Sequence, residues 1–224
     1  MAGIAGWGFI LLSAILDWLA IGLGWNKAKF VTKPLVMILL IGWMSILGGW
    51  NAPVIWFTLG AVFALIGDVC LMLPGNYFLA GLVSFLLAHL LYITGFFTEA
   101  QCLSPVWIIT GVIVICFAVV LTRKIRQGVR RKTGARRLRW SVTIYSVAVT
   151  AMFLSALSTI QKPGWSLSTY FAVALGGMLF YLSDTLLAYD RFVSTIHHGR
   201  LMVRITYHLG QILLLAGVLT HFSG

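Results

Sequence analysis

The chain has 224 residues, of which 60% are hydrophobic and 9% are charged, and its mean hydropathy is +0.99. Because this composition leaves too little polar surface to cover a soluble globule of this size, it predicts an integral membrane protein. The net charge of +11 is of the sign that nucleic acid attracts, but its distribution along the chain, given below, argues against such a partner.

The apolar stretches are about 17 to 23 residues long, as helices that cross a ~30 Å hydrocarbon layer must be, and they lack the alternation of barrel strands. We predict eight transmembrane helices, in chain order at 6–24, 34–49, 54–73, 77–98, 104–122, 141–160, 166–189 and 201–222. The first stretch has no positive region before it and carries Asp17, so we interpret it as a span and not as a signal peptide. The predicted fold class is an all-α, polytopic membrane bundle, with 1–224 as a single transmembrane domain.

Basic residues concentrate in three connections between the predicted spans, which would all face one side. The first connection holds Lys27, Lys29 and Lys33, the second holds Arg123, Lys124, Arg126, Arg130, Arg131, Lys132, Arg136, Arg137 and Arg139, and the third holds Arg191, Arg200 and Arg204. Only Lys162 lies on the opposite side. By the positive-inside bias the basic side is cytoplasmic, so both termini are expected to be non-cytoplasmic.

The basic run 123–139 has two interpretations. Topogenic charge together with attraction to anionic headgroups explains it, and binding of nucleic acid or an acidic protein is the alternative. No aromatic residue interleaves the run before Trp140, which weakens the nucleic-acid interpretation. We therefore expect membrane lipids as partners and no nucleic acid.

Four of the five acidic residues, Asp17, Asp68, Asp184 and Asp190, lie inside or at the ends of predicted spans. A carboxylate is costly to hold in lipid, so an intramembrane Asp predicts a functional site. Asp68 and Asp184 each come about five residues before the cytoplasmic end of a span, which places both about 8 Å from that face. We predict that these two share one cavity, whereas Asp17 either contributes to it or neutralises Lys33.

Further polar residues are expected deeper in the same cavity, which would open to the cytoplasmic side. Span eight places Tyr207 about 10 Å and Gln211 about 15 Å deep, on one helix face. Span four brings His89 and Tyr92 to about 18 Å and beyond. His89 is alternatively an interhelical hydrogen-bonding residue without a chemical role.

Several segments resemble the YhhN-like family, which includes the lysoplasmalogenases. They are Lys33-Pro34-Leu35, the stretch from Gly67 to Pro74, Phe85-x3-His89-x2-Tyr92 followed by Phe96, the Ser183-Asp184 pair, and Tyr207-x3-Gln211. Each motif is weak alone, but their order covers nearly the whole chain.

The resemblance implies an enzyme that hydrolyses the vinyl-ether bond of a lysoplasmalogen, giving a fatty aldehyde and glycerophosphocholine or glycerophosphoethanolamine. Asp68 and Asp184 would be the catalytic carboxylates, with Asp68 favoured as the acid and Asp184 as the base or cation stabiliser. The expected substrate-binding residues are Asp17, Lys33, His89, Tyr92, Ser183, Tyr207 and Gln211. No metal and no cofactor is predicted, and the lysophospholipid is the expected partner.

Two other functions compete with this one. Asp68, Asp184 and His89 or His208 would be ligands in a zinc-dependent intramembrane lipid hydrolase. A small-molecule or lipid transporter would instead use the aspartates as a proton relay or a cation site. The sequence leaves the oligomeric state open, and the membrane is either a bacterial inner membrane or the endoplasmic reticulum.

Overall fold

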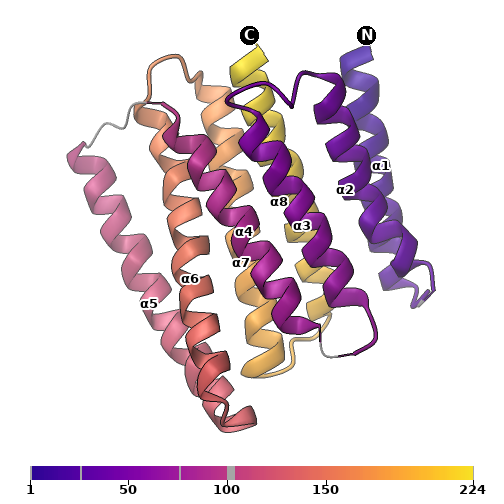
Figure 1. Cartoon of the computed structure of the whole chain (residues 1–224), viewed down its shortest axis with the longest axis vertical. Helices are drawn as coiled ribbons and strands as arrows, with labels where there is room; N and C mark the ends of the chain where they lie inside the picture. Colours follow the sequence, from indigo (N-terminus) through magenta and orange to yellow (C-terminus); the bar gives the residue numbers. More distant parts are fainter. Residues whose placement is uncertain (1, 26, 76, 100–103, 224) are drawn as a thin grey trace. The chain divides into compact units, whose positions relative to one another are not determined.

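The computed structural model describes residues 2–25, 27–75, 77–99 and 104–223, and all regular structure in these ranges is helical. The elements are α1 (Ala2–Gly22), α2 (Lys29–Ile46), α3 (Ile55–Met72), α4 (Phe78–Phe97), α5 (Pro105–Thr133), α6 (Arg136–Leu157), the 3-10 helix η1 (Ser158–Gln161), α7 (Leu167–Phe192) and α8 (Gly199–Ser223) (Figure 1). Each predicted span falls on one of these α-helices, so the all-α class is confirmed.

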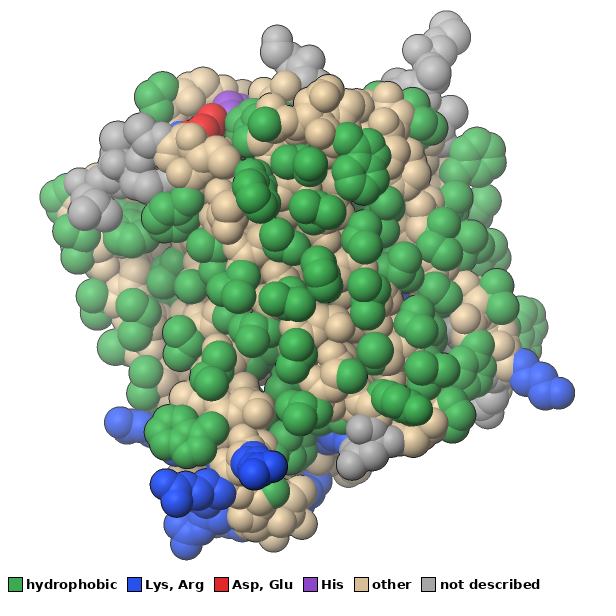
Figure 2. Space-filling view, viewed as in Figure 1, with side chains coloured by type: hydrophobic (Ala, Val, Ile, Leu, Met, Phe, Trp, Pro, Cys, Tyr) green, Lys and Arg blue, Asp and Glu red, His purple; other side chains and the backbone are tan. Residues whose placement is uncertain are grey.

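Six helical stretches in the described residues are long and apolar enough to cross a membrane, and α1 and α2 contain shorter apolar stretches. Large apolar side chains point outward from these helices, for example Val106, Ile113 and Val120 on α5, which are 63–73% exposed. Hydrophobic side chains cover most of the face drawn in Figure 2. Such a surface requires lipid around it, so the protein is a multi-pass membrane bundle.

The chain divides into two compact units, which we describe separately. The first contains residues 1–95 and 218–224, and the second contains residues 96–217. Helix α8 thus belongs to the second unit up to Gly217 and to the first unit from Val218 onward. That the two units act as one transmembrane domain stays a prediction.

In the first unit, glycines bring α3 and α4 into close contact. A Cβ at Gly67 would lie 2.7 Å from the ring of Phe85, and one at Gly60 would overlap the ring of Tyr92. The Tyr92 ring also stacks on Phe57, with ring centroids 5.9 Å apart. Small residues at such positions let helices approach closely in lipid, where packing is the main force that holds them together.

The second unit uses the same device between α7 and its two neighbours. A Cβ at Gly177 of α7 would lie 2.9 Å from the Ala156 Cβ of α6, and one at Gly210 of α8 would lie 2.8 Å from the Phe180 backbone nitrogen. These contacts fix the register of α7 against both helices. They thereby also place Ser183 and Asp184, the polar residues that follow one to two turns later on α7.

The basic run 123–139, which we call the basic hairpin, is helical over most of its length. We expected a connection there, but α5 continues to Thr133 and α6 begins at Arg136. Lys and Arg are good helix formers and are favourable in a last helical turn, which explains the continuation. Gly134, with a φ of 64°, ends α5 in the left-handed conformation. Figure 2 shows Lys and Arg gathered at this lower end of α5 and α6.

Candidate functional site

In the first unit, α2 and α3 bring Lys33 and Asp68 together. The Lys33 Nζ lies 2.6 Å from Asp68 Oδ1, and the two side chains are 10% and 1% exposed. From the sequence we expected Lys33 to pair with Asp17 or to bind substrate, so its pairing with Asp68 was not predicted. The pair supplies Asp68 with the positive charge that a buried carboxylate needs.

Asp17, which is fully buried on α1, accepts a hydrogen bond from Thr32 of α2. The Thr32 Oγ1 lies 2.6 Å from Asp17 Oδ1. The same hydroxyl also lies 3.1 Å from the Ala28 carbonyl oxygen, one turn earlier. Asp17 therefore holds the start of α2 against α1 through Thr32, the residue directly before Lys33.

His89 and Tyr92 both lie on α4 and have no exposed surface. Tyr92 faces α3 at Gly60 and Phe57, as described above. The structure thus places five predicted site residues, Asp17, Lys33, Asp68, His89 and Tyr92, in the interior of the first unit.

In the second unit, α6 and α7 bring Tyr145 and Asp184 together. The Tyr145 hydroxyl donates a hydrogen bond to Asp184 Oδ2 at 2.6 Å, and both residues are buried. The neighbouring Ser183 is also buried, and its hydroxyl donates to the Val203 carbonyl oxygen of α8 at 3.2 Å. Asp184 therefore lies between two helices: Tyr145 of α6 donates a hydrogen bond to it, and the adjacent Ser183 is hydrogen-bonded to α8.

Tyr207 and Gln211 lie one turn apart on α8, and both are buried, as is His208 between them. Tyr207 packs edge-on against Phe180 of α7, with ring centroids 5.6 Å apart. The predicted catalytic pair is thus divided, Asp68 in the first unit and Asp184 in the second. The prediction that the two share one cavity stays a prediction.

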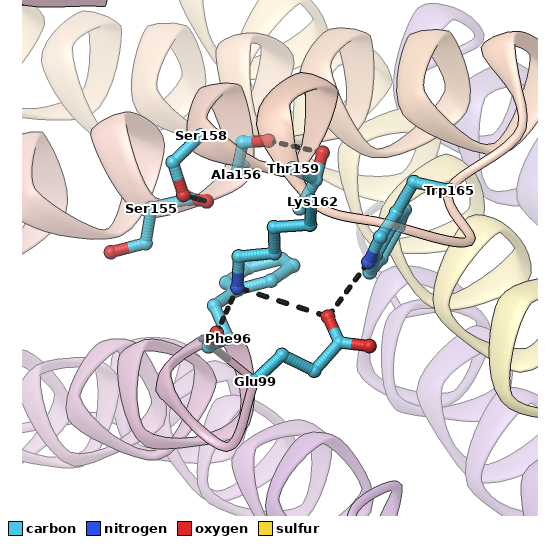
Figure 3. A network of polar contacts seen from close by, with 8 residues as sticks. All are labelled: Phe96, Glu99, Ser155, Ala156, Ser158, Thr159, Lys162 and Trp165. Atoms are coloured by element: carbon cyan, nitrogen blue, oxygen red, sulfur yellow. Dashed lines mark hydrogen bonds and ion pairs between the residues drawn. The ribbon is translucent and has the colours of Figure 1, made fainter. Parts of the chain in front are cut away.

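A second polar cluster, at the end of the second unit opposite the basic hairpin, was not predicted (Figure 3). Lys162, just after η1, is 4% exposed and donates a hydrogen bond to the Phe96 carbonyl oxygen at the end of α4. Its Nζ lies 3.9 Å from Glu99 Oε2, and that oxygen accepts a 2.7 Å hydrogen bond from the Trp165 indole.

Burial has a larger effect on the Lys162 ammonium than its acidic neighbour has. Burial lowers the pKa of Lys162 from its ordinary value of 10.5, and the nearby Glu99 carboxylate opposes the shift by raising the pKa. The sequence held a signal for the cluster, because Lys162 is the one basic residue outside the basic side and Glu99 is the one acid in a predicted connection on that opposite side. Tyr145 gave no such signal, since an aromatic residue in an apolar helix is ordinary.

The zinc interpretation requires at least three ligands that converge. Within the described ranges, no three His, Cys, Asp or Glu side chains are grouped as metal ligands.

Known proteins similar to this chain include lysoplasmalogenases. Lysoplasmalogenase TMEM86B of Sus scrofa is 32% identical over 149 residues, which are 66% of this chain and 57% of the pig protein. The same-named protein of Rattus norvegicus is 28% identical over 191 residues, 85% of this chain and 72% of the rat protein. The Homo sapiens protein is 27% identical over 195 residues, 86% of this chain and 75% of its own length.

The chain thus spans less than two thirds of the pig relative's length. No solved structure matches the chain. The model of the YhhN family matches residues 28–218, which include Lys33, Asp68, Asp184 and the polar residues of α4 and α8. The match extends from the end of the first connection nearly to the end of α8, and on this basis the chain belongs to the YhhN family.

Proposed function

We propose that this protein is an intramembrane hydrolase that cleaves the vinyl-ether bond of lysoplasmalogens to a fatty aldehyde and glycerophosphocholine or glycerophosphoethanolamine. The observation that carries the proposal is the burial of two carboxylates, Asp68 at 0% and Asp184 at 8% exposure, in a chain whose relatives are named lysoplasmalogenases. Carboxylates inside a membrane are rare, and they commonly mark a functional site.

The reaction needs one acid and one carboxylate. A proton adds to the β-carbon of the vinyl ether, and the electrons of the double bond form the new C–H bond, which leaves an oxocarbenium ion. Water adds to this cation and loses a proton, and the hemiacetal then collapses to the aldehyde and the glycerol hydroxyl. The proton lost by water replaces the proton given by the acid, so the cycle consumes one water. This division of labour is that of glycosidase carboxylates.

The partners of the two aspartates favour one assignment of roles. Lys33 stabilises Asp68 as a carboxylate, which suits it to stabilise the cation or to accept a proton from water. With Asp68 paired to an ammonium, the role of acid falls to Asp184, which contacts the neutral phenol of Tyr145. We therefore propose Asp184 as the acid and Asp68 as the carboxylate, the reverse of the assignment favoured from sequence.

The remaining residues would bind and orient the lysophospholipid. His89, Tyr92, Ser183, Tyr207 and Gln211 supply buried polar groups for water and for the glycerol oxygens. Because Lys33 is engaged by Asp68, we assign the headgroup phosphate to Arg191, which is exposed at the end of α7. Asp17 acts indirectly, by holding the start of α2 through Thr32.

For topology, we propose eight spans with the basic hairpin on the cytoplasmic side and both termini on the other. The site would then open to the cytoplasmic leaflet of a bacterial inner membrane or of the endoplasmic reticulum. The support within the second unit is that its ends differ in charge: the basic hairpin and the α7–α8 connection lie at one end, and Lys162 lies at the other.

Incubation of pure protein with choline and ethanolamine lysoplasmalogens, beside their saturated-ether analogues, tests the reaction. We expect aldehyde from the vinyl ethers alone, and in D2O one deuterium on the carbon next to the aldehyde carbonyl. Cleavage of saturated ethers, or aldehyde without deuterium, would contradict proton transfer to carbon. Turnover that a chelator stops and zinc restores would support the zinc alternative instead.

Asp68→Asn and Asp184→Asn test the carboxylates. Each is expected to abolish aldehyde release while the protein stays folded in detergent. If the two act in the same step, the double variant will be no slower than either single variant, because residues that act as a unit are not additive. Activity retained in both single variants would contradict the carboxylate mechanism.

A further inference from the structure

The contact between Tyr145 and Asp184 is the hydrogen bond most closely tied to the proposed acid. It joins two buried side chains on different helices at 2.6 Å, and it ends on one named oxygen, Oδ2. A protonated carboxylic acid has one carbonyl oxygen, which accepts, and one hydroxyl oxygen, which donates. The hydrogen bond with the Tyr145 phenol therefore fixes the orientation of the Asp184 carboxyl group, which limits the directions in which this group can give a proton.

The surrounding packing fixes this contact. The α6–α7 interface is set by Gly177 against Ala156 and by the rings of Phe153 and Tyr181, whose centroids are 5.7 Å apart. The interface then continues along both helices to Tyr145 and Asp184. A side chain held by a packed interface is the type of residue that positions a catalytic group precisely.

We propose that Tyr145 is a positioning residue for Asp184, and this proposal rests on the proposed function. Its hydrogen bond orients the Asp184 carboxyl group and stabilises the carboxylate that forms when the acidic proton leaves. The O–H bond of the Asp184 carboxylic acid breaks, the proton joins the β-carbon of the vinyl ether, and the negative charge appears on a carboxylate that accepts from the phenol. A hydrogen bond to an ionised acceptor is about twice as strong as one to a neutral acceptor, so the contact gains strength as the proton moves.

Tyr145→Phe tests the inference, because it removes the hydroxyl and keeps the ring. We expect kcat to fall roughly 10- to 100-fold with KM changed less than about threefold, since the lost interaction is one that strengthens in the transition state. Tyr181→Phe is the matched control: this residue is equally buried on α7, and its hydroxyl bonds to Thr150 and Thr185 and not to a carboxylate. Its kcat should stay within about twofold of wild type.

A purely structural role would give a different pattern. It would lower the thermal midpoint in parallel with activity, would raise KM as much as it lowers kcat, and would leave the solvent isotope effect unchanged. Positioning of an acid predicts that Tyr145→Phe keeps its thermal midpoint close to that of the control and that its solvent isotope effect on kcat is at least as large as in wild type. In an Asp184→Asn background the added Tyr145→Phe change should have no further effect.

Site-specific 3-fluorotyrosine at position 145 keeps both shape and donor and covers the case in which phenylalanine does not fold. It should retain wild-type kcat within about threefold. Loss of activity there, or full kcat in Tyr145→Phe, would overturn the inference. The test of the proposed function and the test of Tyr145 have different outcomes. If the wild-type protein does not cleave vinyl ethers, the proposed function is wrong. If the wild type is active, Asp184→Asn is inactive and Tyr145→Phe is unaffected, only the role of Tyr145 is wrong.

Discussion

The Lys33–Asp68 pair of the first unit and the Lys162–Glu99 pair of the second differ in which partner is the more deeply buried. In the first pair the carboxylate is 1% exposed and lies 2.6 Å from the ammonium. In the second the ammonium is 1% exposed, the carboxylate is 27% exposed, and the separation is 3.9 Å. The first arrangement provides for a buried negative charge, and the second provides for a buried positive one.

The surroundings of each pair match that difference. Asp68 lies within an apolar span, and the ammonium of Lys33 places a positive charge against it there. Lys162 lies between helices and donates to the carbonyl oxygen of Phe96, as a cation at a helix C-terminus does. We interpret the first pair as part of the chemistry and the second as a clasp that holds the end of α4 near η1.

Neutralising the carboxylate of each pair tests most directly whether the two pairs have different roles. Asp68→Asn should lower aldehyde release by about 10²- to 10⁴-fold, the usual weight of a catalytic carboxylate. Glu99→Gln should leave kcat within about twofold of wild type. Both are measured as initial rates on the same lysoplasmalogen in detergent, and a large loss in Glu99→Gln would place the clasp in the chemistry as well.

Removing one ammonium tests how far Asp68 depends on its partner. Lys33→Met leaves a buried carboxylate without that charge and should cost about 3–5 kcal/mol of stability. The double variant Lys33→Met/Asp68→Leu should recover most of the loss, because neither charge then remains to be buried. Thermal unfolding in detergent measures both, and equal midpoints for the single and double variants would contradict the pairing.

The same design applied to the clasp should give a smaller effect. Glu99→Gln removes the countercharge of Lys162 and should cost about 1–2 kcal/mol, less than a fully buried pair because Glu99 is partly exposed. A cycle with Lys162→Met isolates the interaction between the two. A coupling energy near zero would mean that Lys162 is held by the Phe96 carbonyl alone.

The indole of Trp165 supplies a neutral hydrogen bond to the same carboxylate. Trp165→Phe removes the donor and keeps an aromatic ring, so it should cost about 0.5–1.5 kcal/mol, the net worth of one such bond. The change should be smaller in a Glu99→Gln background, where the acceptor is no longer charged.

The lowered pKa of Lys162 predicts a pH dependence with a definite sign. Between that lowered pKa and the ordinary value of 10.5, the unfolded chain binds more protons than the folded chain, so the stability contribution of Lys162 rises with pH. The thermal midpoint of wild type minus that of Lys162→Met should therefore increase with pH through this window. A difference that falls with pH would show that Glu99 outweighs burial.

The helices were predictable from sequence because the length of an apolar stretch directly reflects the thickness of the lipid that it crosses. The basic hairpin was not, since charge marks the end of the hydrocarbon layer and not the end of the helix: Arg and Lys continue α5 until Gly134 ends it. Burial of Asp68 and Asp184 followed from their apolar neighbours. Their partners did not, because Lys33 and Tyr145 lie on other helices and meet them only through interhelical register.

The rigid form of the basic hairpin bears on how this protein responds to bilayer thickness. Only Gly134 and Ala135 separate α5 from α6, and Gly128 packs against the Phe192 backbone, so the charges are carried on helices anchored to α7 and cannot extend independently as a loop would. In a thicker bilayer these cations would be drawn toward hydrocarbon, which is costly, and the second unit would have to reduce its tilt or thin the lipid around it. On the proposed topology, we expect the basic hairpin to limit how deep the second unit lies in the bilayer, and therefore how far Asp184 lies below the headgroups.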